Sequence, residues 1–396
     1  MAKVVIIGGG ASGIVAAIKA SKKHEVTLLE RNDKLGKKIL ITGNGRANYW
    51  NTLIESKYYH TDDVMALEDV LSHKDEVFSF LSSIGLYPKE IGNFIYPYSK
   101  SAASLRELLL YALQDKVKII TNFKVQEIIK VGKEFHIKSK DGECIKAEKL
   151  VVASGSKAMP KTGSDGSLYP ILENLGHTLH PVLPSLAPLI AKHKVPSWEG
   201  VRVDASLTLH IDGEAVMQEE GEVQLTKNGI SGICIFNVSG EASRALNKGS
   251  QVYITLHFLP FLENFAAFIR SRRTVMGNVS IEKSLESIFP YKLLFVLLEY
   301  ASIEREKKLD LLSSEEIKRL ERAITSFRVD IASADYEKAQ VCTGGIPLKE
   351  IDVHTFESKK SKNLYIVGEI LDVDGNCGGY NLAFAFISGY LAGSTL

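Results

Sequence analysis

The stretch "KVVIIGGGASGIVAAIKASKKHEVTLLERND", residues 3–33, decides the fold. Its apolar start over 3–7 predicts a buried strand, and a glycine turn leads from this strand into a segment with helical periodicity over 11–22. A second apolar strand is predicted over 25–30. Apolar strands joined by one helix are typical of a βαβ unit in a parallel sheet, so the sequence predicts an α/β fold of Rossmann type.

The glycine turn has the spacing GxGxxG where the strand enters the helix. Such a turn brings backbone against a pyrophosphate, and the start of the helix offers unpaired N–H groups to the phosphates. Glu30 ends the second strand, where a carboxylate accepts the hydroxyls of an adenosine ribose. A tight turn with a surface glutamate is the plain alternative, and the complete βαβ context weighs against it. The residues expected at the phosphates are Gly8, Gly10, Ala11, Ser12 and Gly13.

The residues that follow discriminate between NAD and FAD. An NAD dehydrogenase would continue into another βα unit, whereas residues 31–51, "RNDKLGKKILITGNGRANYWN", form a basic glycine loop. Lysines in such a loop neutralise pyrophosphate, and its backbone N–H groups can lie against a planar ring. Together with GxGxxG, the loop favours FAD. The loop residues expected to contact the cofactor are Arg31, Lys37, Lys38, Thr42, Gly43, Asn44, Gly45, Arg46 and Asn48.

From Gly36 to Asn51 the sequence resembles the GRKxxISGGGRCNxTN loop of the bacterial aminoacetone oxidase family of FAD-dependent oxidoreductases, a branch of the two-dinucleotide-binding-domain flavoproteins. Ala47 departs from this pattern, which has a cysteine there, so any chemistry that needs the cysteine is absent here. The resemblance covers nearly the whole chain and is weakest over 260–327. Further matches are "FIYPYSKSAASL" from Phe94, "VVASGSKAMPKTGSDGSLY" from Val151, "LTKNGISG" from Leu225 and "VCTGGIPLKEID" from Val341.

The resemblance implies a second half of the cofactor site in "GEILDVDGNCGGYN", residues 368–381. There Glu369 would bind the ribityl side of the flavin, and the N-terminus of the last helix would face the pyrimidine edge and stabilise a reduced flavin by about 0.3–2 kcal/mol. Of Asp372 and Asp374, one is expected to bond loop N–H groups and the other to meet Lys38 or Arg46. The implied contacts are Gly368, Glu369, Asp374, Gly379, Tyr380, Asn381 and Leu382.

Two further segments complete the implied site. A strand that ends in Ala153, Ser154 and Gly155 resembles the ATG turn of flavoproteins, where the chain passes close to the cofactor. Val125 corresponds to the position whose backbone pairs with the adenine edge. Truncation after about residue 340 is therefore expected to abolish flavin binding although GxGxxG remains.

Changes of periodicity along the chain suggest three domains. A discontinuous Rossmann-like FAD-binding domain is expected over 1–188 and 338–396, with a small antiparallel meander between 117 and 152. A β-rich insert is expected over 189–259 and 328–337, with a hairpin at 210–216 and further strands near 222–226 and 251–258. Residues 260–327 read as a helical subdomain, in which "SSEE" predicts a helix capped by serine.

The composition excludes several classes of function. A net charge of +1 leaves no overall electrostatic footprint for nucleic acid or an anionic membrane. The four cysteines form neither a CxxC pair nor a zinc spacing, so no metal site is predicted and the thiols are expected to be reduced. No apolar run approaches the ~20 residues of a membrane span. A cytoplasmic protein without a membrane partner is the expectation.

The resemblance implies an oxidase of small primary amines such as aminoacetone, which converts amine to imine, then to carbonyl and ammonia, with oxygen reduced to hydrogen peroxide. A second GxGxxG is missing, which favours oxygen over a dedicated NAD domain. The alternative is an NAD(P)H-dependent reductase of enone or steroid-like substrates, because members of the family are linked to that reaction. The candidates at the flavin ring are Asn48, Tyr98 and Tyr380, with Lys161 weaker.

A third reading is a flavoprotein that binds nucleic acid through the helical segment. Basic residues in this segment could grip phosphate, but Glu282 and Glu286 interleave with them, so we do not expect nucleic acid binding. The basic residues are Arg270, Arg272, Arg273 and Lys283.

Overall fold

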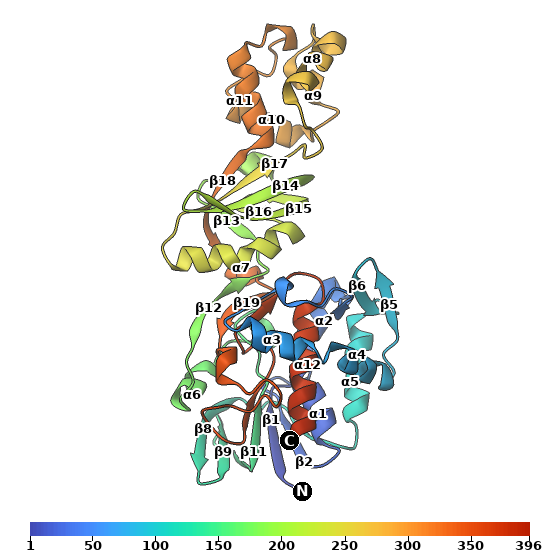
Figure 1. Ribbon diagram of the computed structural model, residues 1–396, viewed down its shortest axis with the longest axis vertical. Helices are drawn as coiled ribbons and strands as arrows, with labels where there is room; N and C mark the ends of the chain where they lie inside the picture. Colours follow the sequence, from blue (N-terminus) through green and yellow to red (C-terminus); the bar gives the residue numbers. More distant parts are fainter. The chain divides into compact units, whose positions relative to one another are not determined.

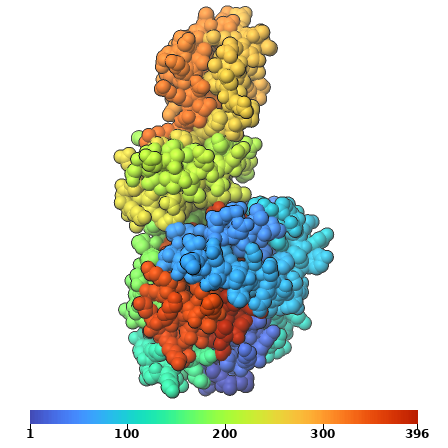
Figure 2. Space-filling model, viewed as in Figure 1, coloured from blue at the N-terminus to red at the C-terminus, as the bar shows by residue number.

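The structure is a computed structural model that describes all residues from Met1 to Leu396. The chain forms two compact units (Figure 1). The discontinuous unit comprises Met1–Leu183 and Gln340–Leu396, and the inserted unit comprises Pro184–Ala339. In the discontinuous unit, the early and late parts of the chain lie side by side on the face shown in Figure 2, as the blue and red surfaces show. The first and last segments of the sequence therefore build one body.

A five-stranded parallel sheet forms the centre of the discontinuous unit, in the order β20-β11-β1-β2-β7. Every neighbouring pair in this sheet is parallel. The predicted Rossmann-type α/β fold is confirmed, and the apolar residues of β1 are buried as an interior strand requires. The strands are β1 (Lys3–Ile7), β2 (Glu25–Leu29), β7 (Lys118–Ile120), β11 (Lys149–Val152) and β20 (Leu364–Ile366).

Helices α1 (Ala11–Ala20) and α12 (Tyr380–Thr395) pack together at backbone contact. A Cβ at Gly389 would lie 2.2 Å from the carbonyl oxygen of Ser12, and one at Gly393 would lie 2.4 Å from that of Ala16. Only glycine permits this approach, so these two residues fix how closely the last helix lies on the first. The other helices of the unit are α2 (Lys37–Ile41), α3 (Val64–Leu71), α4 (Lys74–Ser83), α5 (Ala102–Leu113) and α6 (Tyr169–Asn174).

Four small sheets surround the parallel sheet. The meander predicted between 117 and 152 is present as β8 (Val125–Val131), β9 (Glu134–Ser139) and β10 (Cys144–Ala147). The other three sheets, with strand orders β3-β6-β5, β21-β4 and β12-β19, are built from β3 (Trp50–Asn51), β4 (Tyr59–Thr61), β5 (Pro88–Ile91), β6 (Phe94–Pro97), β12 (His180–Ser185), β19 (Val341–Gly345) and β21 (Val373–Gly375).

The inserted unit contains a closed barrel with the strand order β13-β16-β15-β14-β17-β18. The predicted hairpin is the β14–β15 connection. Its strands are β13 (Leu189–Ala191), β14 (Arg202–Ile211), β15 (Glu214–Thr226), β16 (Gly229–Ser231), β17 (Val252–His257) and β18 (Phe327–Ala334). This region also contains α7 (Ile233–Asn247), which the sequence patterns did not indicate, and its buried residues recur with helical spacing.

Helices α8 (Phe265–Met276), α9 (Ile281–Leu285), α10 (Tyr291–Tyr300) and α11 (Ser314–Thr325) follow the strand β17. Ser313 caps α11 as predicted, because its side chain accepts from the Glu316 amide while Glu316 accepts from the Ser313 amide. One apolar core runs from the barrel into these helices, through ring contacts of Phe327 with Trp198, Phe258 and Tyr300. None of the helices combines the length and the apolar character that a membrane span requires.

Candidate functional site

The carboxyl ends of four parallel strands meet at one edge of the sheet in the discontinuous unit. Strands β1, β2, β11 and β20 lead into Gly8, Glu30, Ala153 and Gly368 respectively. Backbone hydrogen bonds join these ends, from Ala153 N–H to the Ile7 oxygen at 2.8 Å and from Val367 N–H to the Val152 oxygen at 3.0 Å. Ligands of open α/β sheets bind at this edge. The structure thus brings four separately predicted motifs together.

The three glycines of GxGxxG occupy different environments. A Cβ at Gly8, where φ is +106°, would lie 2.3 Å from the Ala153 oxygen, and one at Gly13 would lie 1.9 Å from the Gly8 oxygen. Packing therefore explains these two. Gly10 has an ordinary φ of −87° and no atom within 4 Å of its Cβ position, at the N-terminus of α1. The space beside Gly10 suits a pyrophosphate that approaches the backbone, so the cradle fits a dinucleotide.

Glu30 is buried beside this glycine turn, at the end of β2. One carboxylate oxygen accepts from Gly9 N–H at 2.9 Å, and the other accepts from the backbone and side chain of Asn32, both at 2.8 Å. These bonds fix the carboxylate against the turn. Arg31 is directed elsewhere, because it pairs with Asp165 at 2.5 Å and donates to the Gly163 oxygen.

The ASG turn after β11 lies against the first glycine of the motif, as the contact of Gly8 with Ala153 shows. Gly155 has φ of +72°, and a Cβ there would lie 2.4 Å from Ser164 Oγ. Ser154 donates from its own hydroxyl to the Gly155 oxygen at 3.3 Å. Val125 is buried at the start of β8, opposite Ser139, next to an irregularity in the strand register.

The basic loop turns sharply and exposes its backbone. Gly43, Asn44 and Gly45 follow one another with φ of +55°, +53° and +81°, and these residues are exposed together with Arg46. Ala47 is buried and also has positive φ, +53°. Thr42 donates its hydroxyl to the Ile39 oxygen, and Lys37 pairs with Asp33. The loop backbone is therefore accessible, and its contact with a planar ring stays a prediction.

Lys38 joins this loop to the end of β20. Its ammonium lies 2.5 Å from a Glu369 oxygen, and the other Glu369 oxygen accepts from Cys342 N–H at 3.3 Å. The expectation that Lys38 or Arg46 pairs with one of the two aspartates was wrong for Lys38, because Glu369 lies nearer in the fold. Gly368 adjoins α1, since a Cβ there would lie 2.5 Å from Ser12 Oγ. Contacts thus join the segments 8–13, 36–46 and 368–369 at one place in the fold, which forms the proposed cofactor cradle.

Asp372 bonds an amide of strand β19, whereas loop amides were expected for one of the two aspartates. One of its oxygens accepts from Gly344 N–H at 2.9 Å, and the other lies 2.6 Å from Nδ1 of His180. Asp374 is buried in β21 opposite His60 of β4. No spacing pattern in the sequence indicates His180, because it lies 192 residues from Asp372.

The turn before α12 is held by the loop and strand that follow the basic segment. Gly379 has φ of +96° and packs on Trp50, whose oxygen would lie 2.4 Å from a Cβ at this position. Asn381 clamps Gly375 through two hydrogen bonds of 2.9 and 2.7 Å, so its side chain serves the turn. The N–H groups of the first turn of α12, which includes Leu382, have no partner within the helix. This end remains suited to the flavin edge.

The side chains of the three catalytic candidates have different partners within the protein. The Asn48 amide faces the carbonyls of Trp50 and Ile95 and, with its nitrogen towards them, donates to both at 3.0 and 3.2 Å. The ring of Tyr380 is buried against Tyr58 and Tyr59, and burial raises the pKa of its hydroxyl to about 12. Tyr98 is 60% exposed at the end of the β5–β6 hairpin, with its ring against Tyr87.

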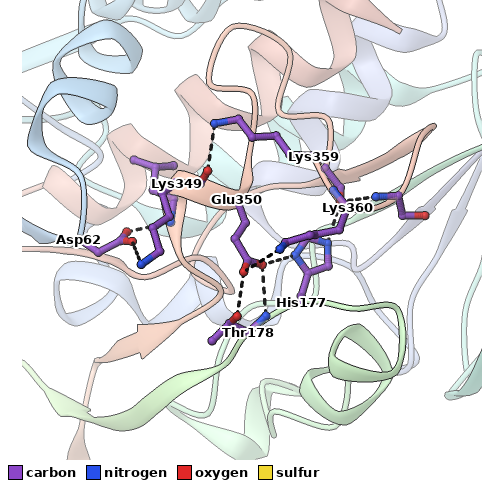
Figure 3. A network of polar contacts seen from close by, with 10 residues as sticks. Asp62, His177, Thr178, Lys349, Glu350, Lys359 and Lys360 are labelled. Carbon is purple, nitrogen blue, oxygen red and sulfur yellow. Dashed lines mark hydrogen bonds and ion pairs between the residues drawn. The ribbon is translucent and has the colours of Figure 1, made fainter.

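A second histidine lies in a closed network (Figure 3). The ring of His177 is 2.8 Å from Glu350 through Nδ1 and 2.8 Å from the Ser358 hydroxyl through Nε2. Glu350 also accepts from the hydroxyl and N–H of Thr178, and Lys360 lies 3.8 Å away. The network joins the α6–β12 connection to residues 348–360, so it serves the fold.

Comparison with known proteins agrees with this geometry. The fold resembles that of a flavocytochrome c3 fumarate reductase in its open conformation, with a TM-score of 0.51 at 15% identity, over 100% of this chain and 78% of that chain. The chain thus has the Rossmann-type fold of FAD oxidoreductases, and FAD is its cofactor. The family described as "HI0933-like protein Rossmann domain" matches residues 2–395, and the protein belongs to that family.

Two kinds of curated relative match nearly the whole chain. A 3-dehydro-bile acid delta(4,6)-reductase of Clostridium scindens is 38% identical over 99% of this chain and 98% of its own length. The ribosomal RNA dihydrouridine synthases of Escherichia coli and Haemophilus influenzae are 26% and 25% identical over 99% and 98% of this chain, and 97% and 96% of theirs. The protein is therefore an FAD-dependent oxidoreductase.

Proposed function

We propose that the protein is a reductase that uses FAD to reduce a carbon–carbon double bond conjugated to a carbonyl, on a steroid-like 3-oxo substrate. The observation that carries the proposal is the 38% identity, over 99% of the chain, to the bile acid delta(4,6)-reductase. A 3-oxo steroid with double bonds at positions 4 and 6 is such a conjugated system. NADH or NADPH would be the source of electrons.

The relatives that act on RNA support the same class of reaction. Dihydrouridine is uridine with one ring double bond reduced, and that bond is conjugated to a carbonyl. Two relatives with different substrates thus share the addition of hydrogen across a polarised double bond. We infer that the common chemistry extends to this chain, whereas the substrate follows the nearer of these two relatives.

The residues described above would hold the cofactor for this reaction. Glu30 would accept the ribose hydroxyls, the space beside Gly10 would take the pyrophosphate, and Lys38 with Glu369 would close the cradle. The N-terminus of α12 would stabilise negative charge at the flavin edge by about 0.3–2 kcal/mol. When bound, FAD supplies the two-electron chemistry, and the protein supplies orientation and electrostatics.

Amine oxidation remains the alternative, on the resemblance of the loop from Gly36 to Asn51 alone. The relatives named above give it no support, and Ala47 departs from the loop of that family. Reduction of RNA is the other candidate. Against it, the cationic groups of the helical segment are engaged internally: Arg272 and Arg273 donate to backbone carbonyls, and Lys283 pairs with Glu286.

The proposal is tested with the purified holoprotein under anaerobic conditions. NADH or NADPH should bleach the flavin spectrum, and a 3-oxo-4,6-diene bile acid should restore it with loss of the dienone absorbance. An unmodified ribosomal RNA transcript and aminoacetone serve as the other substrates. Bleaching by aminoacetone, with no response to either nicotinamide, would overturn the proposal in favour of the oxidase. Reoxidation by RNA but not by the dienone would overturn the choice of substrate.

A further inference from the structure

We propose that His180, held by the buried carboxylate of Asp372, is the proton donor that completes this reduction. The inference rests on the proposed function, because it assigns the second half of the same reaction. Reduction of a conjugated double bond adds a hydride to one carbon and a proton to the other. The hydride comes from the flavin that NAD(P)H has reduced, and the proton must come from a group on the protein or from water.

The pair has the geometry of an oriented acid. Asp372 is 3% exposed, and its two oxygens divide between Gly344 N–H at 2.9 Å and His180 Nδ1 at 2.6 Å. An ionised carboxylate only accepts, so Nδ1 carries a hydrogen. The opposite nitrogen, Nε2, makes no hydrogen bond within the chain, and a third of the His180 side chain is exposed. The carboxylate thus orients the ring and leaves Nε2 as the nitrogen without a partner in the chain.

The pair also lies close to Glu369, which is expected to bind the cofactor. Strand β19 presents Cys342 N–H to Glu369 and, two residues on, Gly344 N–H to Asp372. Two residues span about 7 Å along a strand and point to the same side. Asp372 therefore follows the carboxylate expected at the ribityl chain and precedes the α12 N-terminus expected at the pyrimidine edge. Through its bond to Asp372, His180 lies beside this segment of the chain.

Other proton donors fit less well. Burial raises the pKa of Tyr380 to about 12, which makes it a weak acid at neutral pH. Tyr98 lies on the exposed side of a hairpin, and both nitrogens of His177 are already engaged. Asp372 is the titratable group in contact with His180. His60 and Asp374 lie next to Asp372, because one ring nitrogen of His60 and one carboxylate oxygen of Asp374 are within 4.8 Å of an Asp372 oxygen.

The balance of the step is simple. A C–H bond forms from the hydride at one carbon, a second C–H bond forms from the Nε2 proton at the other, and the carbon–carbon π bond breaks. The substrate gains two electrons and the flavin loses them. His180 regains its proton from water through its exposed edge.

The test separates the two half-reactions of the holoprotein by stopped-flow spectroscopy. In His180→Gln, reduction of the flavin by NADPH should keep its wild-type rate, whereas reoxidation by the 3-oxo-4,6-diene bile acid at saturating concentration should slow about 10²-fold. Asp372→Asn, which preserves shape and the acceptor for Gly344, should slow reoxidation by a smaller factor. His354→Gln, an exposed histidine of the same unit, is the matched control and should match the wild type.

A solvent deuterium effect gives a readout that a structural role would not move. The rate of flavin reoxidation in the wild type should fall in deuterium oxide. In His180→Gln, this rate should no longer vary with pH as it does in the wild type. Wild-type rates of reoxidation in His180→Gln would overturn the inference while leaving the proposed function intact. If the dienone fails to reoxidise the wild-type flavin, the proposed function itself fails, so the two failures are distinguishable.

Discussion

His177 and His180 lie three residues apart in the chain, and each faces a buried carboxylate, but their surroundings differ. The ring of His177 is closed in by Glu350 and Ser358, with no exposed side-chain surface. Ser358 Oγ already accepts from two backbone N–H groups, so its hydrogen must go to Nε2 of His177. Both nitrogens of the His177 ring therefore have hydrogen-bond partners when the imidazole is neutral. His180 makes one hydrogen bond and keeps an exposed edge.

The difference separates positions that the protein explains from positions that need something else. His177, Gly8 and Gly13 are accounted for by their own contacts. His180 and Gly10 are not, because one has an unused nitrogen and the other faces open space without backbone strain. Residues like His180 and Gly10, whose character the protein's own contacts do not explain, mark the site. Substitutions at both kinds of residue test this distinction.

The largest effect is expected at Glu350. Glu350→Ala removes the acceptor for His177 and for the hydroxyl and N–H of Thr178, which leaves buried donors unpaired at about 1–3 kcal/mol each. The free energy of unfolding should fall by about 3 kcal/mol or more, measured by urea denaturation. Glu350→Gln keeps one acceptor and should lose about half as much. Equal losses in both variants would show that the hydrogen bonds do not stabilise this region.

The glycines Gly13 and Gly10 form a matched pair. Gly13→Ala places a methyl group against the Gly8 backbone, and overpacking of this kind costs about 3 kcal/mol because the backbone must move. Gly10→Ala should change the stability of the apo-protein by less than about 1 kcal/mol, yet weaken FAD binding at least about tenfold. Thermal unfolding measures the stability of each variant, and titration followed by flavin fluorescence measures its affinity for FAD. Unchanged FAD affinity in Gly10→Ala would show that Gly10 does not serve the cofactor.

Acid should weaken the His177 network. Burial lowers the pKa of His177, so the unfolded chain, near pKa 6.5, takes up a proton that the folded state resists. Stability is complete above pH 6.5 and falls below it, by at most about 1.4 kcal/mol per pH unit. His177→Gln should remove this slope, which urea denaturation between pH 8 and 5 would reveal. Parallel curves for the two proteins would contradict a neutral His177.

Hydrogen bonds also keep the Glu350 carboxylate ionised. Although burial opposes ionisation, the bonds from Thr178 and His177 hold the pKa of Glu350 below its usual range. That contribution is present above the ordinary carboxyl pKa and is lost in stronger acid. Both groups therefore weaken the fold in the same direction as pH falls.

The smallest effect on stability is expected at His180. His180→Gln removes one hydrogen bond from a side chain that is one third exposed, while Asp372 keeps the Gly344 amide, so the loss should be about 1 kcal/mol. Denaturation of the holoprotein measures it. A loss as large as that of Glu350→Ala would place His180 with the structural residues and end the contrast.

Local patterns predicted much of the fold and part of the site. The sequence reveals GxGxxG with Glu30, and also the glycines before α12, because each of these motifs is defined by residues that lie close together in the chain. The meander and the Ser313 cap were found for the same reason. Helix α7 was missed because its apolar residues were read within a region of strands.

The pairings of charged groups were harder to predict. Lys38 meets Glu369 and not an aspartate, and His180 meets Asp372, because the fold brings together residues that lie 331 and 192 positions apart. No periodicity encodes such contacts, which depend on where the strands end. Sequence reasoning thus found the motifs, and the structure was needed to find their partners.

The close packing of α12 on α1 has a consequence for biosynthesis. Near the end of this contact, Lys23 donates to the Ser394 oxygen across 371 residues of chain. At about 5–20 residues per second, a ribosome needs about 20–75 s to make that stretch. During that interval the face of α1 that packs on α12 has no α12 to contact. The inserted unit has its own core and can fold before α12 is made. The N-terminal helix is therefore made first but is among the last elements to complete its packing.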